Sequence, residues 1–470
     1  MLTAVLAAAS AATALNTVSV KNQEFIDDKT GQRFMVLGVD YQPGGQAGYK
    51  PQDGSDVLTD KNACLRDAAI IQSLGANTVR IYNIDPDLNH DDCMSIFNYA
   101  GIYVILDVNS PLVGESIDRS APWTTYTEAY LTRVFRVIEA FKSYPNTLAF
   151  FAGNEIINDD STTTYNPQYI RAVQRDMKNY IAKHSSRKIP VGYSAADVRD
   201  VLHDTWAYLQ CAIDGDSNDM SRSDFLGLNS YSWCGDASFH SSTYDELVAF
   251  FSDSTIPTFF SEYGCTKVKP RTFSEVGTLY GTQMTVLSGG LVYEYSMEDE
   301  DFGLVQINSN GTVSLLPDFD SLQAAYNKVN VTLVESANST ATSLTPPPCS
   351  SNLINATYFD KNFTLPATPA QNLIDNGVPS APAGKLVDVS STSLPVAVYG
   401  TNGQAVSGLT LQSRSSQNTP GGANTSSGNP TSTSSGPSPS ATKKSAASSV
   451  NPLVGLSVMI SAMAFALLML

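Results

Sequence analysis

Two glutamates follow apolar runs in the central part of the sequence, and their positions suit acid–base or nucleophilic chemistry. Glu155 closes the segment FFAGNE (150–155), and Glu262 lies within FFSEYG (259–264). A carboxylate directly after a buried run either costs stability or serves a function. Two carboxyl groups about 5 Å apart across a sugar ring can protonate a leaving oxygen and attack an anomeric carbon. The pair therefore predicts a retaining glycosidase mechanism, whereas either glutamate alone could simply accept hydrogen bonds from loop amides.

The two glutamates meet only if the surrounding chain folds so that they converge. Between residues 33 and 327, continuous apolar runs rich in β-branched and aromatic residues favour strands buried on both faces of a parallel sheet. The expected strands are 33–41, 76–83, 102–109, 147–155, 189–194, 225–231, 258–264 and 290–296. Apolar residues at helical spacing predict helices at 62–74, 127–141, 167–181, 244–251, 273–284 and 319–326.

Eight strand–helix units over about 300 residues predict an α/β fold, the (β/α)8 or TIM barrel. An open, doubly wound sheet is the alternative, but no Gly-x-Gly-x-x-Gly follows the first expected strand. In a barrel, the active site lies at the carboxyl ends of the strands. Polar and aromatic residues close or follow the other strands there: Gln42, Tyr82, Asp107, Tyr231, Trp233 and Tyr293. Sugars offer apolar ring faces and hydroxyl groups, so this shared position predicts a carbohydrate cleft.

The composition narrows the class of partner. The chain has 28 Lys and Arg against 45 Asp and Glu, a net charge of −17, which argues against a nucleic-acid partner because phosphates need a basic face. Hydrophobic residues make up 42% of the 470 residues, enough for a large core. The six cysteines form no Cys-x-x-Cys and no Cys/His cluster, so a structural zinc site is not expected.

Both ends of the chain resemble targeting signals. Residues 1–14 are small and apolar and end in Ala-x-Ala, which predicts a cleaved signal peptide, with a buried helix as the alternative. Residues 453–470 are uncharged and follow a polar spacer (442–452), an arrangement typical of a removed glycosylphosphatidylinositol (GPI) attachment signal. A tail-anchored helix is the alternative interpretation.

The helical and strand patterns end near residue 330. Residues 331–410 keep enough apolar side chains to pack irregularly on the barrel, and Cys349 could attach them. Residues 411–450 predict a disordered, Ser/Thr-rich, O-glycosylated stalk. Six Asn-x-Ser/Thr sequons predict N-glycosylation after residue 300, at Asn310, Asn330, Asn338, Asn355, Asn362 and Asn424.

Seven segments in order resemble one known family over roughly residues 17–380: GVDYQPGG (38–45), NTVRIYNIDP (77–86), YVILDVNSP (103–111), FFAGNEI (150–156), VGYSAADV (191–198), FSEYGC (260–265) and SGGLVYEYS (288–296). They are similar to the fungal GPI-anchored β-1,3-glucanosyltransferases of glycoside hydrolase family seventy-two, in the short subgroup without a cysteine-rich carbohydrate-binding module. The resemblance implies a catalytic domain at 17–330. Its activity would cut an internal β-1,3-glucan bond and pass the new reducing end to the non-reducing end of another chain.

The resemblance also implies roles for individual residues. Glu155 would be the acid/base and Glu262 the nucleophile that carries the glycosyl group. Asn154 would bond the sugar 2-hydroxyl, and Asp197 would lie on the acceptor side. The remaining substrate-binding expectations are Tyr82 and Tyr293 on the donor side, a donor loop at 109–119 with Asn109, Ser116, Ile117, Asp118 and Arg119, and Tyr231, Gln42 and Asp107. No metal or organic cofactor is implied.

Six cysteines allow fifteen pairings, and the family pattern implies one of them. It pairs Cys64 with Cys93, Cys234 with Cys265, and Cys211 with Cys349. Two departures from the family concern the site: Asp118 stands where Asn is expected, and Leu202 where Arg is expected.

The resemblance further implies a monomer with a GPI lipid on the extracellular face of the cell membrane, or in the cell wall. Its partners would be β-1,3-glucan donor and acceptor chains. A β-1,3-glucan hydrolase and a non-catalytic wall glycoprotein are the alternatives, because the two glutamates do not distinguish water from a sugar acceptor.

Overall fold

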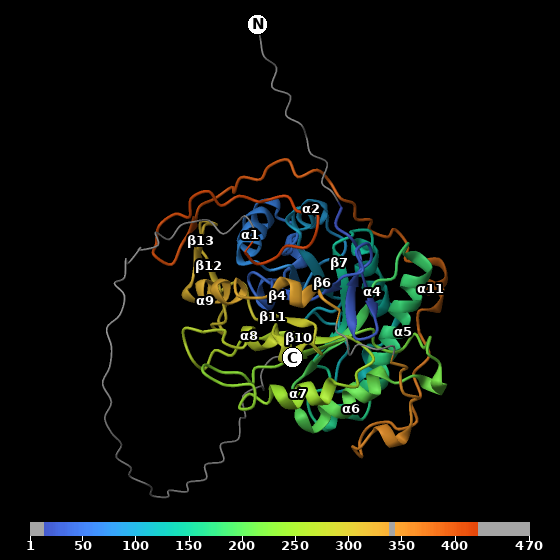
Figure 1. Cartoon of the computed structure of the whole chain (residues 1–470). Coiled ribbons are helices and arrows are strands. Elements are labelled where there is room, and N and C mark those ends of the chain that lie inside the picture. Colours follow the sequence, from blue (N-terminus) through green and yellow to red (C-terminus); the bar gives the residue numbers. More distant parts are fainter. Residues whose placement is uncertain (1–13, 338–343, 422–470) are drawn as a thin grey trace, which may run out of the picture. The chain divides into compact units, whose positions relative to one another are not determined.

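The computed structural model describes residues 14–337 and 344–421 (Figure 1). All of the described residues belong to one compact unit. The expected signal peptide apart from Ala14, the GPI attachment signal and the sequons at Asn338 and Asn424 lie outside the described residues.

Eight parallel strands close into a barrel in the order β10-β11-β4-β5-β6-β7-β8-β9. Their bounds are β4 Val36–Asp40, β5 Thr78–Ile81, β6 Tyr103–Asp107, β7 Thr147–Asn154, β8 Val191–Ala196, β9 Leu226–Asn229, β10 Thr258–Tyr263 and β11 Gly289–Val292. Each overlaps one of the eight expected strands. The (β/α)8 prediction is therefore confirmed, and the doubly wound alternative is wrong.

A small antiparallel sheet lies against one end of the barrel interior. It comprises β1 Val18–Lys21, β2 Glu24–Asp27 and β3 Arg33–Phe34, so the expected strand 33–41 divides into β3 and β4. The Phe25 ring contacts the rings of Phe225 and Phe259, with centroids 5.7 and 5.9 Å apart. These rings and Phe151 belong to a second apolar cluster that fills the barrel interior. The interior is thus a packed core, which leaves the carboxyl ends of the strands for a site.

Helices surround the barrel (Figure 1). They are α1 Lys61–Leu74, α2 Asp91–Ala100, α3 Pro122–Thr125, α4 Glu128–Phe141, α5 Asn166–His184, α6 Arg199–Gln210, α7 Tyr244–Phe251, α8 Val276–Leu279, α9 Pro317–Tyr326, α10 Val331–Glu335 and α11 Gln371–Asn376. Five of the six expected helices correspond to α1, α4, α5, α7 and α9. The single helix expected at 273–284 is wrong: extended backbone at Gly281 separates α8 from a 3₁₀ turn, Thr282–Met284.

Helices α2 and α6 were not expected from the apolar spacing. Helix α2 begins with Asp91 and Asp92 and ends at Ala100, where the next residue, Gly101, is in the left-handed conformation. These are start and stop signals rather than apolar periodicity. Helix α6 contains Leu202, which is only 3% exposed. Leu202, where the resemblance implies arginine, is therefore a packing residue in this fold.

After α10, the described residues from 344 onward pack on the barrel. The Cys211–Cys349 disulfide attaches them, β14 (Val398–Tyr399) adds a strand to β12 (Val305–Ile307) and β13 (Val313–Leu315), and the segment then runs on past residue 410 (Figure 1). Asn418 is 1% exposed, and its amide donates to the carbonyls of Gln72 and Ala76 at 2.9 and 3.0 Å. The expected start of the stalk at 411 is thus too early, because residues 411–421 pack against α1 and α2.

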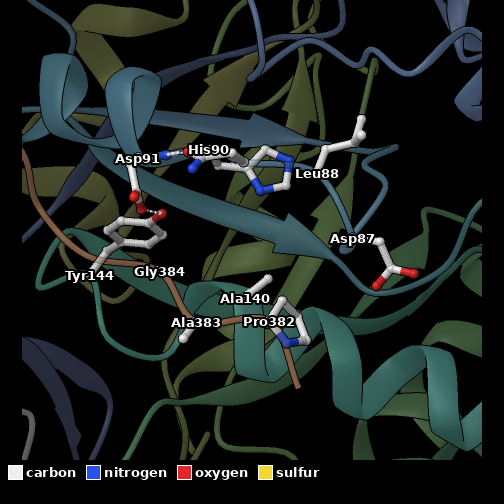
Figure 2. Close-up of a pocket in the computed structure, with 10 residues that line it drawn as sticks. Asp87, Leu88, His90, Asp91, Ala140, Tyr144, Pro382, Ala383 and Gly384 are labelled. Carbon is white, nitrogen blue, oxygen red and sulfur yellow. Dashed lines mark hydrogen bonds between the residues drawn. The ribbon is translucent and has the colours of Figure 1, made fainter. Parts of the chain in front are cut away.

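A hollow of about 210 Å³ marks where this extension crosses the helices. Figure 2 shows Asp91 and Tyr144 pointing toward each other beside the crossing chain at 382–384. Asp91 accepts hydrogen bonds from the Tyr144 hydroxyl at 2.6 Å and from the Lys385 amide at 2.8 Å. These bonds fasten the extension to the barrel, so we assign this hollow to packing rather than to the catalytic face.

The three disulfides pair as the family resemblance implied: Cys64–Cys93, Cys211–Cys349 and Cys234–Cys265. The four sequon asparagines within the described residues, Asn310, Asn330, Asn355 and Asn362, are all exposed. In the part of the chain that the structure describes, no helix combines the length and hydrophobicity needed to cross a bilayer.

Candidate active site

Glu155 and Glu262 are carried by strands on opposite sides of the barrel mouth. Glu155 directly follows β7, and Glu262 lies near the end of β10, three strands further round the barrel. Register shifts interrupt the pairing of both strands just before these residues. Such irregularities re-aim side chains next to active sites. Glu155 also has a φ of 48°, a backbone conformation uncommon for residues other than glycine and concentrated at functional sites.

Glu262 is held by three hydrogen-bond donors. The Tyr82 hydroxyl donates to Oε1 at 2.9 Å, the Tyr231 hydroxyl to Oε2 at 2.8 Å, and Nη1 of Arg80 lies 3.2 Å from Oε1. Burial raises the pKa of Glu262 to about 7; the Arg80 charge opposes this, the Glu155 charge adds to it, and the two phenols lower it. Three donors on one buried carboxyl fix its orientation and favour its ionised form.

Glu155 has a different environment, because it is half-buried and is bound by one amide. Nδ2 of Asn229 donates to Oε1 of Glu155 at 2.8 Å and also to Oδ1 of Asn154 at 3.1 Å. The hydroxyls of Ser194 and Ser261 donate to Oδ1 of Asn229 at 3.1 and 2.8 Å, which sets the orientation of its amide. Asn229 is therefore a positioning residue for Glu155.

Arg80 joins the two halves of the site. It lies within β5 and is fully buried, and its Nε and Nη2 atoms bind the Asp107 carboxylate at 3.0 and 2.9 Å. Nη2 also donates to Oδ1 of Asn154 at 3.0 Å. The contacts form one network from Glu155 through Asn229, Asn154 and Arg80 to Glu262. Asp107, expected to bind substrate, anchors Arg80 in this network.

Asp40, at the end of β4, adds a further buried acid. It is 0% exposed, and neither carboxyl oxygen has a geometrically acceptable hydrogen-bond partner in the described residues. Burial raises its pKa well above its ordinary value against the opposing Arg80 charge, and the Glu262 charge raises it further. A carboxyl in this position favours its neutral form.

Aromatic rings form one wall of the site. Tyr293 lies 6.4 Å, centroid to centroid, from both Tyr82 and Tyr231, in edge-to-face arrangements. Phe302 completes the group at 5.2 Å from Tyr293 and 5.6 Å from Tyr231. Gln42 fixes the backbone beside this wall, since its Oε1 accepts from the backbone amides of Tyr82 and Asn83 at 3.2 and 3.0 Å.

The expected donor loop, 109–119, follows β6 and contacts the end of β7. Asn109 donates to the Ala152 carbonyl at 3.2 Å and accepts from the Tyr130 hydroxyl at 2.7 Å. Ile117 is 5% exposed and belongs to the main apolar core, so its side chain supports the loop. Asp118 is exposed and accepts from Ser120, and that hydrogen bond lowers its pKa. Ser116 is half-buried, and Arg119 is exposed.

Asp197 follows β8, on the other side of β7 from the expected donor loop. It accepts from the Ser230 hydroxyl at 2.7 Å and pairs with Arg199, which also donates to the Thr243 hydroxyl at 3.0 Å. Arg199, rather than the residue at position 202, is the cation that the fold places beside Asp197.

Sequence reasoning missed Arg80, Asn229, Asp40 and Phe302. Arg80 carries a signal that was available, since it is a charged residue inside the apolar strand TVRI. Asn229 ends β9 in the manner of the other strand-end residues. Among the described residues, no three His, Cys, Asp or Glu side chains are arranged to hold a metal ion.

The barrel and its two opposed carboxyl groups, set in a polar and aromatic mouth, define a carbohydrate-active enzyme of the (β/α)8 class. Residues 7–330 match the family model described as glucanosyltransferase. The chain belongs to this family, glycoside hydrolase family seventy-two.

Individual relatives cover most of the chain. It is 54% identical to 1,3-beta-glucanosyltransferase gel2 of Aspergillus fumigatus over 426 residues, which is 90% of this chain and 88% of that protein. It is 48% identical to the probable 1,3-beta-glucanosyltransferase GAS3 of Saccharomyces cerevisiae over 407 residues, with 82% and 77% covered. The solved structure of Saccharomyces cerevisiae Gas2p with laminaritetraose and laminaripentaose is 36% identical, with a TM-score of 0.66 and 76% of each chain covered.

Proposed function

We propose that this protein remodels β-1,3-glucan by retaining transglycosylation, with Glu262 as nucleophile and Glu155 as acid/base. The observation that carries the assignment is the asymmetry of the pair. Glu262 is 8% exposed and bound by three donors, whereas Glu155 is half-buried and bound by one oriented amide. The relatives named 1,3-beta-glucanosyltransferase and the laminari-oligosaccharides bound to Gas2p support the substrate class.

In the first step, an oxygen of ionised Glu262 attacks the anomeric carbon of a bound glucan. Protonated Glu155 gives its proton to the glycosidic oxygen as the bond to the leaving chain breaks. The product is a glycosyl ester of Glu262 and a shortened glucan. Tyr82, Tyr231 and Arg80 hold the nucleophile throughout, and Asn154 bonds the sugar 2-hydroxyl.

In the second step, Glu155, now a carboxylate, removes the proton from the 3-hydroxyl at the non-reducing end of an acceptor glucan. That oxygen attacks the anomeric carbon, the ester bond breaks, and Glu262 leaves as a carboxylate. Water could replace the acceptor without any change in the two glutamates, which would make the protein a hydrolase. Binding of two sugar chains is favoured by the residues proposed for each side. These are Asp197 on the acceptor side, and Tyr82, Tyr293 and the 109–119 loop on the donor side.

The proposed place of action is the extracellular face of the cell membrane, with a GPI lipid attached after the hydrophobic signal at 453–470 is removed, or the cell wall itself. The protein would act as a monomer. The small-residue stretch and polar spacer before the apolar segment support the lipid anchor. A GPI-specific phospholipase should release the protein from membranes. Retention after treatment would indicate a membrane-spanning tail instead.

A product profile tests the activity. Residues 15–421, which include the packed extension, are incubated with a reduced β-1,3-glucan oligosaccharide. Products longer than the substrate are expected from transfer. Products that are only shorter would indicate hydrolysis, and binding without products would indicate a non-catalytic glucan-binding protein. Glu155→Gln and Glu262→Gln should each abolish turnover with the fold retained; substantial activity in either would contradict the assigned roles.

A further inference from the structure

Two large aromatic side chains are exposed together on the catalytic face. Trp123, on α3, is 51% exposed, and Tyr165, just before α5, is 49% exposed. Their rings lie 5.1 Å apart between centroids at an interplanar angle of 84°, an edge-to-face contact. Adjacent exposed aromatic rings are unusual on a soluble protein surface and often mark a binding site.

Both rings stand on loops at the mouth of the barrel. Trp123 lies in the connection after β6, and Tyr165 in the connection after β7, ten residues beyond Glu155. Connections that follow barrel strands form the catalytic face. Nδ2 of Asn166 donates to the carbonyls of Arg119 and Thr162 at 2.8 Å each, which ties the two loops together.

The 109–119 loop connects the two rings to the candidate active site. At its start, Asn109 donates to the carbonyl of Ala152, three residues before Glu155, at 3.2 Å. At its end, the Arg119 carbonyl accepts from Asn166, the residue next to Tyr165, at 2.8 Å. A sugar chain that leaves the carboxyl pair along this side would meet the two rings.

The support beneath the rings is rigid. The amide of Asp118 donates to the Thr125 hydroxyl at 2.9 Å, which anchors α3 to the preceding loop. Below α3, Tyr126 contacts the Tyr169 ring at 5.6 Å and accepts a hydrogen bond from Arg175 at 3.0 Å. Preorganised rings bind a ligand with little loss of conformational entropy.

The chemistry of the rings suits a glucan. β-Linked glucose exposes apolar C–H faces that stack on aromatic rings, and its hydroxyls accept hydrogen bonds. Among the described residues, the indole N–H of Trp123 has no partner and can donate one, unlike those of Trp206 and Trp233. Two rings cover far less area than a stable protein interface requires, so a protein partner is the weaker occupant.

We propose that Trp123 and Tyr165 form an outer sugar-binding platform, which holds a glucose unit of a β-1,3-glucan chain beyond the units at the carboxyl pair. The platform extends the proposed function and rests on it for the identity of the sugar. It would make the enzyme discriminate between substrates by chain length, because only a long glucan reaches from the carboxyl pair to the rim.

The kinetic test compares Trp123→Ala and Tyr165→Ala with the unmodified 15–421 protein. The substrates are reduced β-1,3-glucan oligosaccharides that lengthen by one glucose at a time, used as donor and then as acceptor. Loss of one aromatic stacking contact should lower kcat/KM about tenfold for the long chains and leave the shortest substrates unchanged. Tyr358→Ala is the matched control, because Tyr358 is 58% exposed on the extension. An equal loss at every length, or no loss at any length, would overturn the proposal.

A binding measurement separates the platform from catalysis. The chain has three tryptophans, and Trp206 and Trp233 are only 8% and 5% exposed, so Trp123 dominates solvent-sensitive emission. In the Glu262→Gln variant, a long β-1,3-glucan oligosaccharide should shift this emission to shorter wavelength, and a short one should not. The shift should vanish in Glu262→Gln/Trp123→Phe. An unshifted spectrum with a saturating long oligosaccharide would refute the platform even if transglycosylation were confirmed.

Discussion

Replacement of Glu262 by glutamine should stabilise the protein while abolishing its activity. Burial raises the pKa of this carboxyl from 4.5 to about 7 in the folded protein. The folded state therefore binds the proton more tightly than the unfolded state does. Relative to a neutral side chain, the wild type loses stability as pH rises from about 4.5 through about 7. The pKa difference lowers the free energy of unfolding of the wild type by about 3 kcal/mol at pH 8, and by almost nothing at pH 4.

The assay is thermal unfolding of the 15–421 protein and its Glu262→Gln variant from pH 4 to pH 8. The Tm difference in favour of the variant should be small at pH 4 and grow through pH 7, since glutamine carries no charge. Its single carbonyl oxygen keeps the bonds from Tyr82 and Arg80, and its N–H group can donate to the Tyr231 hydroxyl. Glu275→Gln is the matched control. Burial also raises the pKa of Glu275 to about 7, so this variant should gain stability similarly and keep its activity. A Tm difference for Glu262→Gln that is independent of pH would refute the reasoning.

Three further predictions concern the hydrogen-bond network around the two glutamates and the C-terminal extension. Tyr231→Phe removes a donor from Glu262, so the pKa of the nucleophile should rise and the acidic limb of the kcat/KM profile should move about one unit to higher pH. An unmoved limb would argue against Glu262 as the group that must ionise. Asn229→Ala removes the amide that orients Glu155, so kcat on glucan should fall about tenfold or more. The loss of kcat should be much smaller on a laminaribioside with an aryl leaving group, because that group leaves without a proton. Equal losses on both substrates would contradict the positioning role of Asn229. Cys211→Ser/Cys349→Ser removes a disulfide that spans 138 residues. The free energy of unfolding should fall by about 3 to 5 kcal/mol, and calorimetry should show a lower Tm. An unchanged Tm would mean that other contacts alone hold the extension.

The barrel and its two glutamates could be predicted from sequence because each has a local signal. Parallel strands buried on both faces have continuous apolar runs, and a carboxylate that ends such a run stands out against them. The roles of Arg80 and Asn229 have no comparable local signal. Their partners lie in or directly after four other strands, β6, β7, β8 and β10, and only the register around the closed barrel brings these side chains into hydrogen-bond distance.

The prediction from composition that the packed extension ends at residue 410 was also wrong. The stretch after residue 411 is rich in Ser, Gln, Asn and Gly, which predicts a solvated linker. In the fold, Gln412 donates its backbone amide to the side-chain oxygen of Gln72 at 2.9 Å, and the buried Asn418 donates to the backbone carbonyls of Gln72 and Ala76 at the end of α1. Polar residues can pack tightly when side chains and backbone carbonyls near a helix terminus supply their hydrogen-bond partners, and the composition of a segment does not reveal those partners.

The charge distribution of the mouth favours a stable covalent intermediate in the proposed mechanism. Asp40, Glu262 and Glu294 are buried acids whose pKa values are all raised, chiefly by burial, and Arg80 is already bound to Asp107. The same burial that raises the pKa of Glu262 favours every neutral form of its carboxyl, and the glycosyl ester is one such form. Esterification also removes the repulsion between Glu262 and the carboxylate that Glu155 becomes. An intermediate stabilised in this way can persist until a second glucan chain arrives, which a transferase needs and a hydrolase does not.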